Sequence, residues 1–335
     1  MTDRNEKDNS EFSEEDRQLK NEKTYDSALA AMVTRLSEYT IPFVNFVFGE
    51  QFTDNAKITI RDNKHVVRHL DGSLSRRETD IFIELSEMPT LKYYHFECEV
   101  LFDRGVIIRV AEYGSAIAAD NAVLEDNRLI LEYPYSVVIF LRPSSGIPRT
   151  MTITHRGPDG AEMSYDVPTV QIKDYTIEDI FENRLMILLP FYLFRYANQL
   201  KEIEDKDDKI KEIEDELDEI NQRLWKMYET GEIGAYQKRK IQELLLRVSE
   251  KLTIGFEKIR KGVDDVMSGD ILRTEADDIL DQGIEKGIER GREDATVNHL
   301  KNIMKSFNVT IDKAMDSLMI PQDQRTMYAG LVENS

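Results

Sequence analysis

The sequence predicts an α/β (α+β) protein in which a globular part of strands and helices is followed by long helices. Residues 81–85 and 93–100 are rich in β-branched and aromatic side chains, which favour a pleated, half-buried strand. Residues 25–39 carry apolar side chains at spacings of three and four, typical of one helix face. Residues 203–227 and 241–266 show heptad spacing, which indicates long paired helices.

The composition sets broad limits on the protein class. The chain has 335 residues, enough for two or three domains, and a formal net charge of −20. Charged residues make up 32% of it, which favours a solvated helical part beside a globular one. Its one cysteine, Cys98, excludes an internal disulfide and is typical of a reducing, cytoplasmic compartment. Alternation places Cys98 on the core side of its strand, so we interpret it as a packing residue.

No segment indicates secretion or a membrane partner. The N-terminus is polar and lacks the apolar region of a signal peptide. The longest apolar run, residues 185–194, is about half a membrane span and contains Pro190, so we expect a buried helix. Residues 1–23 are charged and almost free of large apolar side chains, so we expect a disordered tail.

The predicted elements of the globular part alternate between strands and helices. In order they are a helix from near Tyr25 that Pro42 ends or bends, strands at 57–60 and 66–70, a hairpin of 81–85 and 93–100, a helix at 105–119, a strand at 135–142 and a hairpin of 151–155 with 163–167. The first hairpin has a link of about seven residues, in which Pro89 suits a turn. After these elements, Thr176 begins a helix as its N-cap, with an acidic residue three positions on.

Acidic side chains gather on the first hairpin. Successive side chains of a strand point to opposite faces, so Glu97 and Glu99 share one face. If the hairpin is symmetric about Met88 and Pro89, Asp80 lies opposite Glu97, roughly 5 Å away between Cβ atoms. Carboxylates this close repel one another unless a cation compensates, and a hard divalent cation is the simplest choice. The alternative is a solvated strand face whose charges discourage aggregation.

A basic residue follows on the next helix. Arg109 and Tyr113 are four residues apart, so they share a helix face. We interpret the pair as aimed at a phosphate or at Glu99. The alternative is that the Arg109 stem lies along the edge of the core beside Tyr113.

The two heptad stripes predict a long antiparallel helical hairpin, because paired stripes bury each other. The alternative is an intermolecular coiled coil that gives a homodimer, and we favour the hairpin because it needs no partner. Beyond the stripes, Gly283, Gly287 and Gly291 recur every four residues, and each costs a helix about 1 kcal/mol relative to alanine. Either close helix approach or a fraying surface helix explains this repeat. In residues 295–335 we expect two or three short helices.

The acidic region resembles a known family. Asp80, followed by Glu97-Cys98-Glu99 on the next strand, is similar to the PD-(D/E)XK nuclease core. The segment Y-H-F-E-C-E-V-L-F-D-R-G-V-I-I-R-V-A-E-Y (94–113) more narrowly resembles the PD-(D/E)XK family transposases, also called recombination-promoting nucleases. Three later stretches agree with this family: P-Y-S-V-V-I-F-L-R (134–142), V-P-T-V-Q-I-K-D-Y-T-I-E-D-I-F-E (167–182) and G-I-E-K-G-I-E-R-G (283–291).

This resemblance implies a fold and a domain order. The order helix, three strands, helix, strand is that of a PD-(D/E)XK nuclease-like core, a mixed sheet flanked by helices. The implied parts are a disordered tail (1–23), a nuclease-like domain (24–196), a helical hairpin or coiled coil (197–268) and a helical C-terminal appendage (269–335). In this family an acidic residue of the first helix can approach the metal, and Asp26 and Glu38 are the candidates here.

The resemblance also implies a DNA endonuclease that depends on Mg²⁺ or Mn²⁺. By position, Asp80 and Glu97 would bind the metal. Glu99 stands where the family often has glutamine and the wider superfamily has lysine, and a glutamate supplies no positive charge. Either Glu99 is a further metal ligand, with charge coming from Arg109 or the metal, or the protein is catalytically impaired.

DNA is the implied partner, and the charge of the chain restricts how it could bind. Residues 57–77 hold six basic residues against two acidic ones, which suits local phosphate contacts. The net charge of −20 excludes a funnel that attracts DNA from a distance. The second hypothesis is therefore a decayed nuclease fold that acts as a non-enzymatic binding or assembly module through its coiled-coil region.

Overall fold

The computed structural model describes part of the chain, and the description below concerns these residues. They are residues 23–61, 64–68, 74–78, 81–269, 271, 297, 300, 301, 304, 310–318, 320 and 325–333. The chain divides into two compact units, Met1–Ile233 with Gln237–Leu272, and Gly234–Tyr236 with Arg273–Ser335. The predicted tail lies almost entirely outside the described residues, and the predicted domain boundaries stay predictions.

The first unit begins with two helices separated by a short 3-10 turn. They are α3 (Lys23–Arg35), η1 (Ser37–Tyr39) and α4 (Thr40–Phe48). The predicted apolar stripe from Tyr25 to Tyr39 is buried. The prediction that the first helix continues to Pro42 is wrong, because α3 ends at Arg35 and Pro42 lies in the first turn of α4. A proline is tolerated there, since first-turn N–H groups have no acceptor within the helix.

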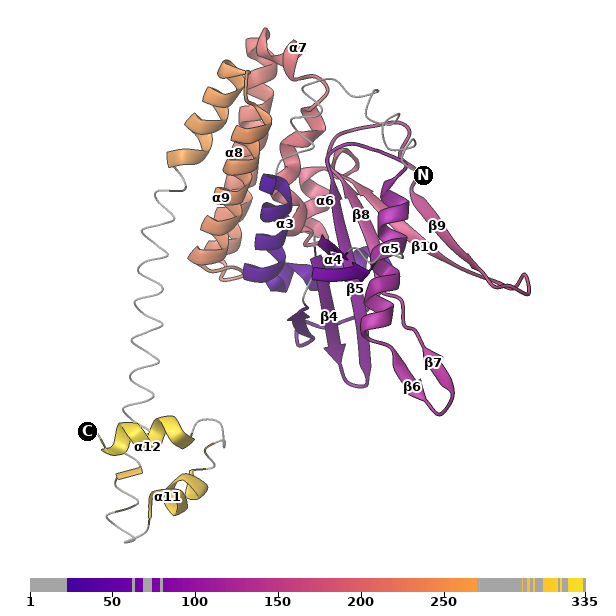
Figure 1. Cartoon of the computed structure of the whole chain (residues 1–335). Helices are drawn as coiled ribbons and strands as arrows, with labels where there is room; N and C mark the ends of the chain where they lie inside the picture. The colour runs from indigo at the N-terminus through magenta and orange to yellow at the C-terminus, as the bar shows by residue number, and fades with distance from the viewer. Residues whose placement is uncertain are drawn as a thin grey trace. The chain divides into compact units, whose positions relative to one another are not determined.

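A six-stranded mixed sheet forms the centre of the unit (Figure 1). Its strands, in spatial order, are β1 (Lys57–Ile60), β4 (Ile81–Glu87), β5 (Thr90–Glu99), β8 (Tyr135–Phe140), β10 (Glu162–Gln171) and β9 (Thr150–Arg156). The β5–β8 and β8–β10 pairs are parallel and the other pairs are antiparallel. The predicted mixed α/β class is confirmed.

The hairpin of β4 and β5 has the predicted register with a shorter link. Pairing runs from Glu87 opposite Thr90 to Ile81 opposite Phe96, symmetric about the peptide bond between Met88 and Pro89. The link is therefore two residues, not seven. Polar residues at the end of each strand continue the ladder, because backbone pairing does not require apolar side chains.

Two further hairpins extend from the sheet region. They are β2 (Lys64–Arg68) with β3 (Leu74–Glu78), and β6 (Val123–Glu125) with β7 (Arg128–Ile130). The sequence predicted a strand near residues 66–70 and missed β3, whose sequence L-S-R-R-E has no apolar alternation.

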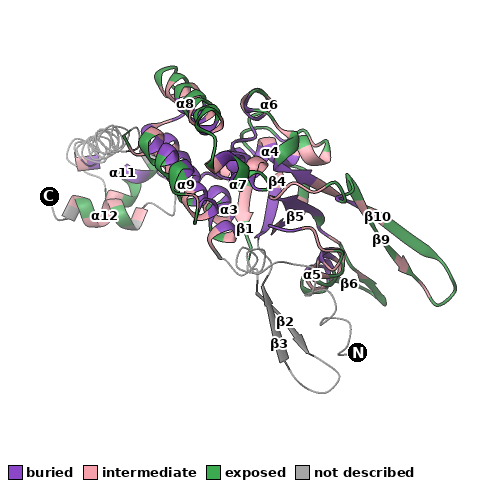
Figure 2. Ribbon diagram, turned by 90° about the horizontal axis from the view of Figure 1, so that it is seen from above, coloured by how far each residue is buried: buried purple, intermediate pink, exposed green. Residues whose placement is uncertain are grey.

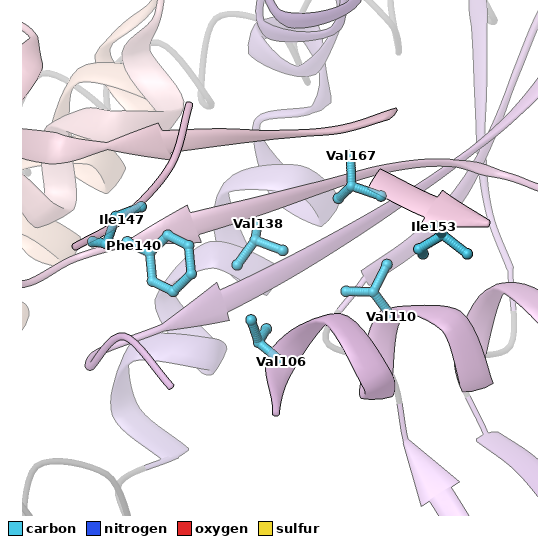
Figure 3. Close-up of a cluster of buried hydrophobic side chains, with 7 residues drawn as sticks. All are labelled: Val106, Val110, Val138, Phe140, Ile147, Ile153 and Val167. Carbon is cyan, nitrogen blue, oxygen red and sulfur yellow. The ribbon is translucent and has the colours of Figure 1, made fainter. Parts of the chain in front are cut away.

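Helix α5 (Val106–Asp120) covers one face of the sheet, and α3 and α4 cover the other (Figures 1 and 2). Val106 and Val110 of α5 pack on apolar side chains of β8, β9 and β10, as Figure 3 shows. The cluster consists of Val106, Val110, Val138, Phe140, Ile147, Ile153 and Val167. On the opposite face, the Phe43 ring of α4 lies edge-on to Phe96 of β5, 5.5 Å between centroids. The central strand β8 is buried on both faces.

The segment after β10 joins the sheet to the long helices. Helix α6 (Ile177–Glu182) begins with the predicted cap, a capping box between Thr176 and Asp179. The predicted buried helix at 185–194 is a 3-10 helix, η3 (Met186–Tyr196), whose apolar residues are buried around Pro190. Within the described part of the chain, no helix combines the length and the apolar character needed to cross a membrane.

The two heptad stripes form several helices. These are α7 (Leu200–Glu204), α8 (Asp207–Glu229), α9 (Ala235–Leu252) and a helical segment at 257–269. Helices α8 and α9 lie side by side, and Gln242 Nε2 donates to Asn221 Oδ1 between them at 2.9 Å (Figure 1). The stripe residues from Ile203 to Leu224 and from Ile241 to Val263 are mostly buried. Gly255, with φ at +86°, lies at the break between α9 and the segment at 257–269.

The second unit has a small core of its own. Helices α11 (Ile311–Ser317) and α12 (Arg325–Glu333) contribute to it. Its buried members are Leu300, Ala314, Met315 and Ile320. Gly283, Gly287 and Gly291 lie outside the described residues, so the explanation of this repeat stays open.

The packing of α5 on the sheet gives a stability prediction. We expect Phe140→Ala to lower the free energy of unfolding by about 3–5 kcal/mol, because it removes a fully buried ring between β8 and α5. Urea unfolding monitored by circular dichroism measures the change. Leu124→Ala, at a β6 side chain that is 72% exposed, is the control and should change stability little. Equal effects of the two substitutions would contradict this account of the core.

Candidate functional site

Strand β5 carries three polar side chains on the face that α5 covers. His95, Glu97 and Glu99 alternate with apolar residues that face α4. The strand lies between β4 and β8: it pairs with β8 through Glu99, and with β4 as far as Phe96. The fold therefore places one histidine and two carboxylates in a row between the sheet and α5.

His95 is completely buried and bonded at both ring nitrogens. Its Nε2 lies 2.7 Å from Glu97 Oε1, and its Nδ1 lies 3.2 Å from Ser136 Oγ on β8. Burial lowers the pKa of His95 to about 3, so the ring is neutral near pH 7. Because an ionised carboxylate only accepts hydrogen bonds, we assign the proton to Nε2, which donates to Glu97. Nδ1 then accepts the bond from the Ser136 hydroxyl.

Glu99 lies at the end of β5 and pairs with Arg109 of α5. Arg109 Nη2 bonds to Glu99 Oε1, and Arg109 Nη1 lies 3.4 Å from Asp103 Oδ2. Burial alone would lower the pKa of Arg109, but the charges and hydrogen bonds of Glu99 and Asp103 outweigh burial and raise this pKa. Asp103 also accepts a bond from the Gly105 backbone N–H, which fixes the turn into α5. One guanidinium thus joins two carboxylates from the strand and the following loop.

The structure brings together most of the residues that the sequence singled out. Glu97 and Glu99 share the predicted face, and Arg109 faces Glu99, one of its two predicted targets. Tyr113, one turn further on α5, lies edge-on to the His95 ring at 5.6 Å. Asp80 lies outside the described residues, so its predicted place opposite Glu97 stays a prediction.

The two acidic candidates of the N-terminal helices lie in elements on the other face of the sheet. Asp26 belongs to α3 and Glu38 to η1, whereas Glu97 and Glu99 face α5 (Figure 2). Burial raises the pKa of Asp26, and a backbone hydrogen bond partly offsets this.

Three residues of this site were missed from the sequence. His95 shares the parity of Glu97 and Glu99, so the alternation of β5 could have identified it. Asp103 stands two residues before Gly105 at the start of a helix, a pattern typical of a side chain that bonds a turn. Ser136 carries no local signal, since only the parallel pairing of β5 and β8 sets it opposite His95.

The described residues by themselves do not complete a metal centre. Within them, no group of three or more His, Cys, Asp or Glu side chains is arranged to hold a metal ion. Asp80 lies outside the described residues, so the metal site of Asp80, Glu97 and Glu99 stays a prediction. The donor chemistry suits a hard cation, because Glu97, Glu99 and Asp103 all present carboxylate oxygens, and only Glu99 and Asp103 pair with the Arg109 guanidinium in the contacts described above.

Comparisons of the chain with family models, with curated proteins and with solved structures gave no match. The family resemblance therefore rests on the residues quoted for it.

The burial of His95 predicts a pH dependence of stability. The unfolded chain takes up a proton at this residue below about pH 6.5, whereas the folded chain does so only near pH 3. Stability due to His95 is therefore complete at neutral pH and is lost as the pH falls. Between pH 7 and pH 5 we expect this residue to lower the free energy of unfolding by about 2 kcal/mol.

Urea unfolding of the wild type and of His95→Gln at both pH values measures this contribution. Other groups titrate in both proteins, so the informative quantity is the difference between their losses. Equal losses in the two proteins would show that His95 takes up its proton at the same pH in the folded and unfolded chain, against a lowered pKa.

Proposed function

We propose that the protein is a divalent-metal-dependent DNA endonuclease with a PD-(D/E)XK-like core, which hydrolyses phosphodiester bonds. The observation that carries the proposal is the row of acidic side chains on β5, together with Arg109 of α5. Glu97 is 4% exposed, and a carboxylate so buried is costly to keep ionised unless a partner such as a cation compensates its charge.

The β4–β5 register supports a third carboxylate at the same place. Residues opposite each other in this hairpin keep one register from Glu87 and Thr90 to Ile81 and Phe96. One more pair in that register would set Asp80 opposite Glu97. Opposed Cβ atoms lie roughly 5 Å apart, so both carboxylates would reach one ion.

In this proposal Asp80 and Glu97 hold Mg²⁺ or Mn²⁺, and Glu99 contributes a further oxygen. The metal, when bound, lowers the pKa of a water and offsets charge on the scissile phosphate. Glu99 holds Arg109 at the end of β5, where the guanidinium is about one-third exposed and can contact a phosphate. The positive charge that a lysine supplies in the wider superfamily would then come from Arg109.

DNA contacts are assigned to the basic stretch 57–77. The hairpin of β2 and β3 belongs to this stretch and lies in the chain between β1 and β4. It carries most of the basic residues of the stretch, so phosphate contacts would be local to it. Local contacts of this kind are compatible with DNA binding despite the net charge of −20.

The long helices are proposed to form an antiparallel hairpin within one chain. The bond between Asn221 and Gln242 and the buried apolar stripes support this arrangement. A homodimer through the same helices is the alternative, and sedimentation of the full chain separates the two.

Isosteric substitution of the carboxylates tests the endonuclease. We expect Asp80→Asn and Glu97→Gln each to lower Mg²⁺-dependent nicking of supercoiled plasmid on the order of 10³-fold, because a metal supplies several kcal/mol of stabilisation to the transition state. Glu87→Gln, at an exposed carboxylate of the same hairpin that bonds Thr53, is the matched control and should cut like the wild type. Failure of the wild-type protein to nick DNA with Mg²⁺ or Mn²⁺ would contradict the proposal.

A non-enzymatic binding or assembly module is the second candidate. The pairing of Glu99 with Arg109 favours it, because this carboxylate is already balanced by a cation of the same chain. In such a decayed nuclease the long helices would bind the partner, and Glu97 and Glu99 would have only a structural role between β5 and α5.

Substitution of Glu99 by the superfamily residue distinguishes an active protein from an impaired one. If Glu99 is a metal ligand, Glu99→Lys lowers Mn²⁺ affinity and nicking together, and Glu99→Gln does so less strongly. If the protein is impaired by the lack of a lysine, Glu99→Lys raises nicking instead. We expect the first result, and calorimetric titration with Mn²⁺ beside the nicking assay measures both quantities. A rise in nicking would contradict the role of Glu99 as a ligand.

A further inference from the structure

His95 lies in the same row of β5 side chains as Glu97 and Glu99, and the proposed function gives it no role. It lies two residues before Glu97 on the same face of β5, and its Nε2 is 2.7 Å from Glu97 Oε1. A histidine with no exposed surface, placed on a carboxylate of a proposed metal site, needs an explanation beyond packing.

The ring is held from several sides. Ser136 Oγ lies 3.2 Å from Nδ1, and the Tyr113 ring lies edge-on at 5.6 Å between centroids. Phe82 of β4 is the residue directly opposite in the antiparallel register. With both nitrogens bonded and no access to water, the imidazole has one orientation. Its bond to Oε1 fixes the rotation of the Glu97 carboxylate and so determines where Oε2 points.

Serine, histidine and glutamate also form hydrolytic triads, but this set cannot work as one. Ser136 lies on the central strand β8 and is 3% exposed, so no substrate reaches its hydroxyl. The hydroxyl is engaged with His95 Nδ1 instead. The order of contacts, from Ser136 to His95 to Glu97, ends on the carboxylate that the proposed function assigns to the metal.

We propose that His95 is a positioning residue, which orients the Glu97 carboxylate toward a hard divalent cation and is itself held in place by Ser136. The inference rests on the proposed function for the identity of the cation site. Residues that orient metal ligands in this way typically contribute 10- to 100-fold to metal affinity, roughly, because a free carboxylate must otherwise be ordered on binding.

Ser136→Ala tests the positioning role of His95 without changing Glu97 itself. It removes one hydroxyl and leaves the imidazole able to turn. Calorimetric titration of the full chain with Mn²⁺ should show affinity reduced about 10-fold, and His95→Gln should reduce it by about 10- to 100-fold. Ser249→Ala is the matched control, because it removes a buried serine hydroxyl from α9, an element that does not contribute to the acidic row. It should bind Mn²⁺ like the wild type.

A resonance of the ring itself gives a readout that a merely structural role would not move. In ¹⁵N-labelled wild-type protein, Mg²⁺ should shift the Nε2–H signal of His95, since the bonded carboxylate becomes a metal ligand. This measurement decides the question even if both variants fail to fold. An Nε2–H signal that Mg²⁺ leaves unchanged would overturn the inference.

The outcomes separate this inference from the proposed function. If the wild type binds Mn²⁺, and Ser136→Ala and His95→Gln bind it as tightly as Ser249→Ala does, the positioning role is wrong and the metal site stands. If the wild type binds neither Mn²⁺ nor Mg²⁺, the metal site is wrong and the positioning role falls with it.

Discussion

His95, Glu97 and Glu99 of β5 are buried or partly buried against α5, and this part of the molecule depends on how these polar side chains find partners there. Strand β5 has a neighbouring strand on each side and a helical layer on each face, so Glu97 and Glu99 are largely withdrawn from bulk water, at 6% and 14% side-chain exposure. Ionised groups in such surroundings cost several kcal/mol unless they find partners. Glu97 is hydrogen-bonded to His95, and Glu99 forms an ion pair with Arg109. The position of α5 over β5 is therefore tied to the chemistry of the row as well as to apolar packing.

Much of this arrangement could be predicted because it follows from local rules. The alternation of β5 is a property of any strand, so the shared face of Glu97 and Glu99 needed no knowledge of the rest of the fold. Symmetry about the Met88–Pro89 bond likewise set the β4–β5 register. The link length was misjudged because the strands continue through polar residues, where hydrophobic patterning carries no signal but backbone bonds still form.

The remaining features depend on contacts between distant parts of the chain. Ser136 meets His95 only because β8 returns parallel to β5 after α5, and no pattern within either strand specifies that register. The second strand of the β2–β3 hairpin is too polar to be identified by itself. The break in the first helix at Leu36, where apolar periodicity continues unbroken into η1, shows that a continuous stripe does not require a continuous helix. Periodicity reports which side chains are buried, and backbone breaks are set by the partners of the stripe.

The polar pair between α8 and α9 has a consequence for how two molecules could meet. Asn221 and Gln242 bond in only one axial alignment of α8 and α9. A shift of α9 by one turn would leave both side-chain amides among apolar side chains without this hydrogen bond. An α9 donated by a second molecule in the same alignment would make an identical contact, with only the path of residues 230–234 changed. Closed and exchanged forms would then be equal in their side-chain contacts. Chain concentration and the stiffness of that five-residue connection would determine which form prevails.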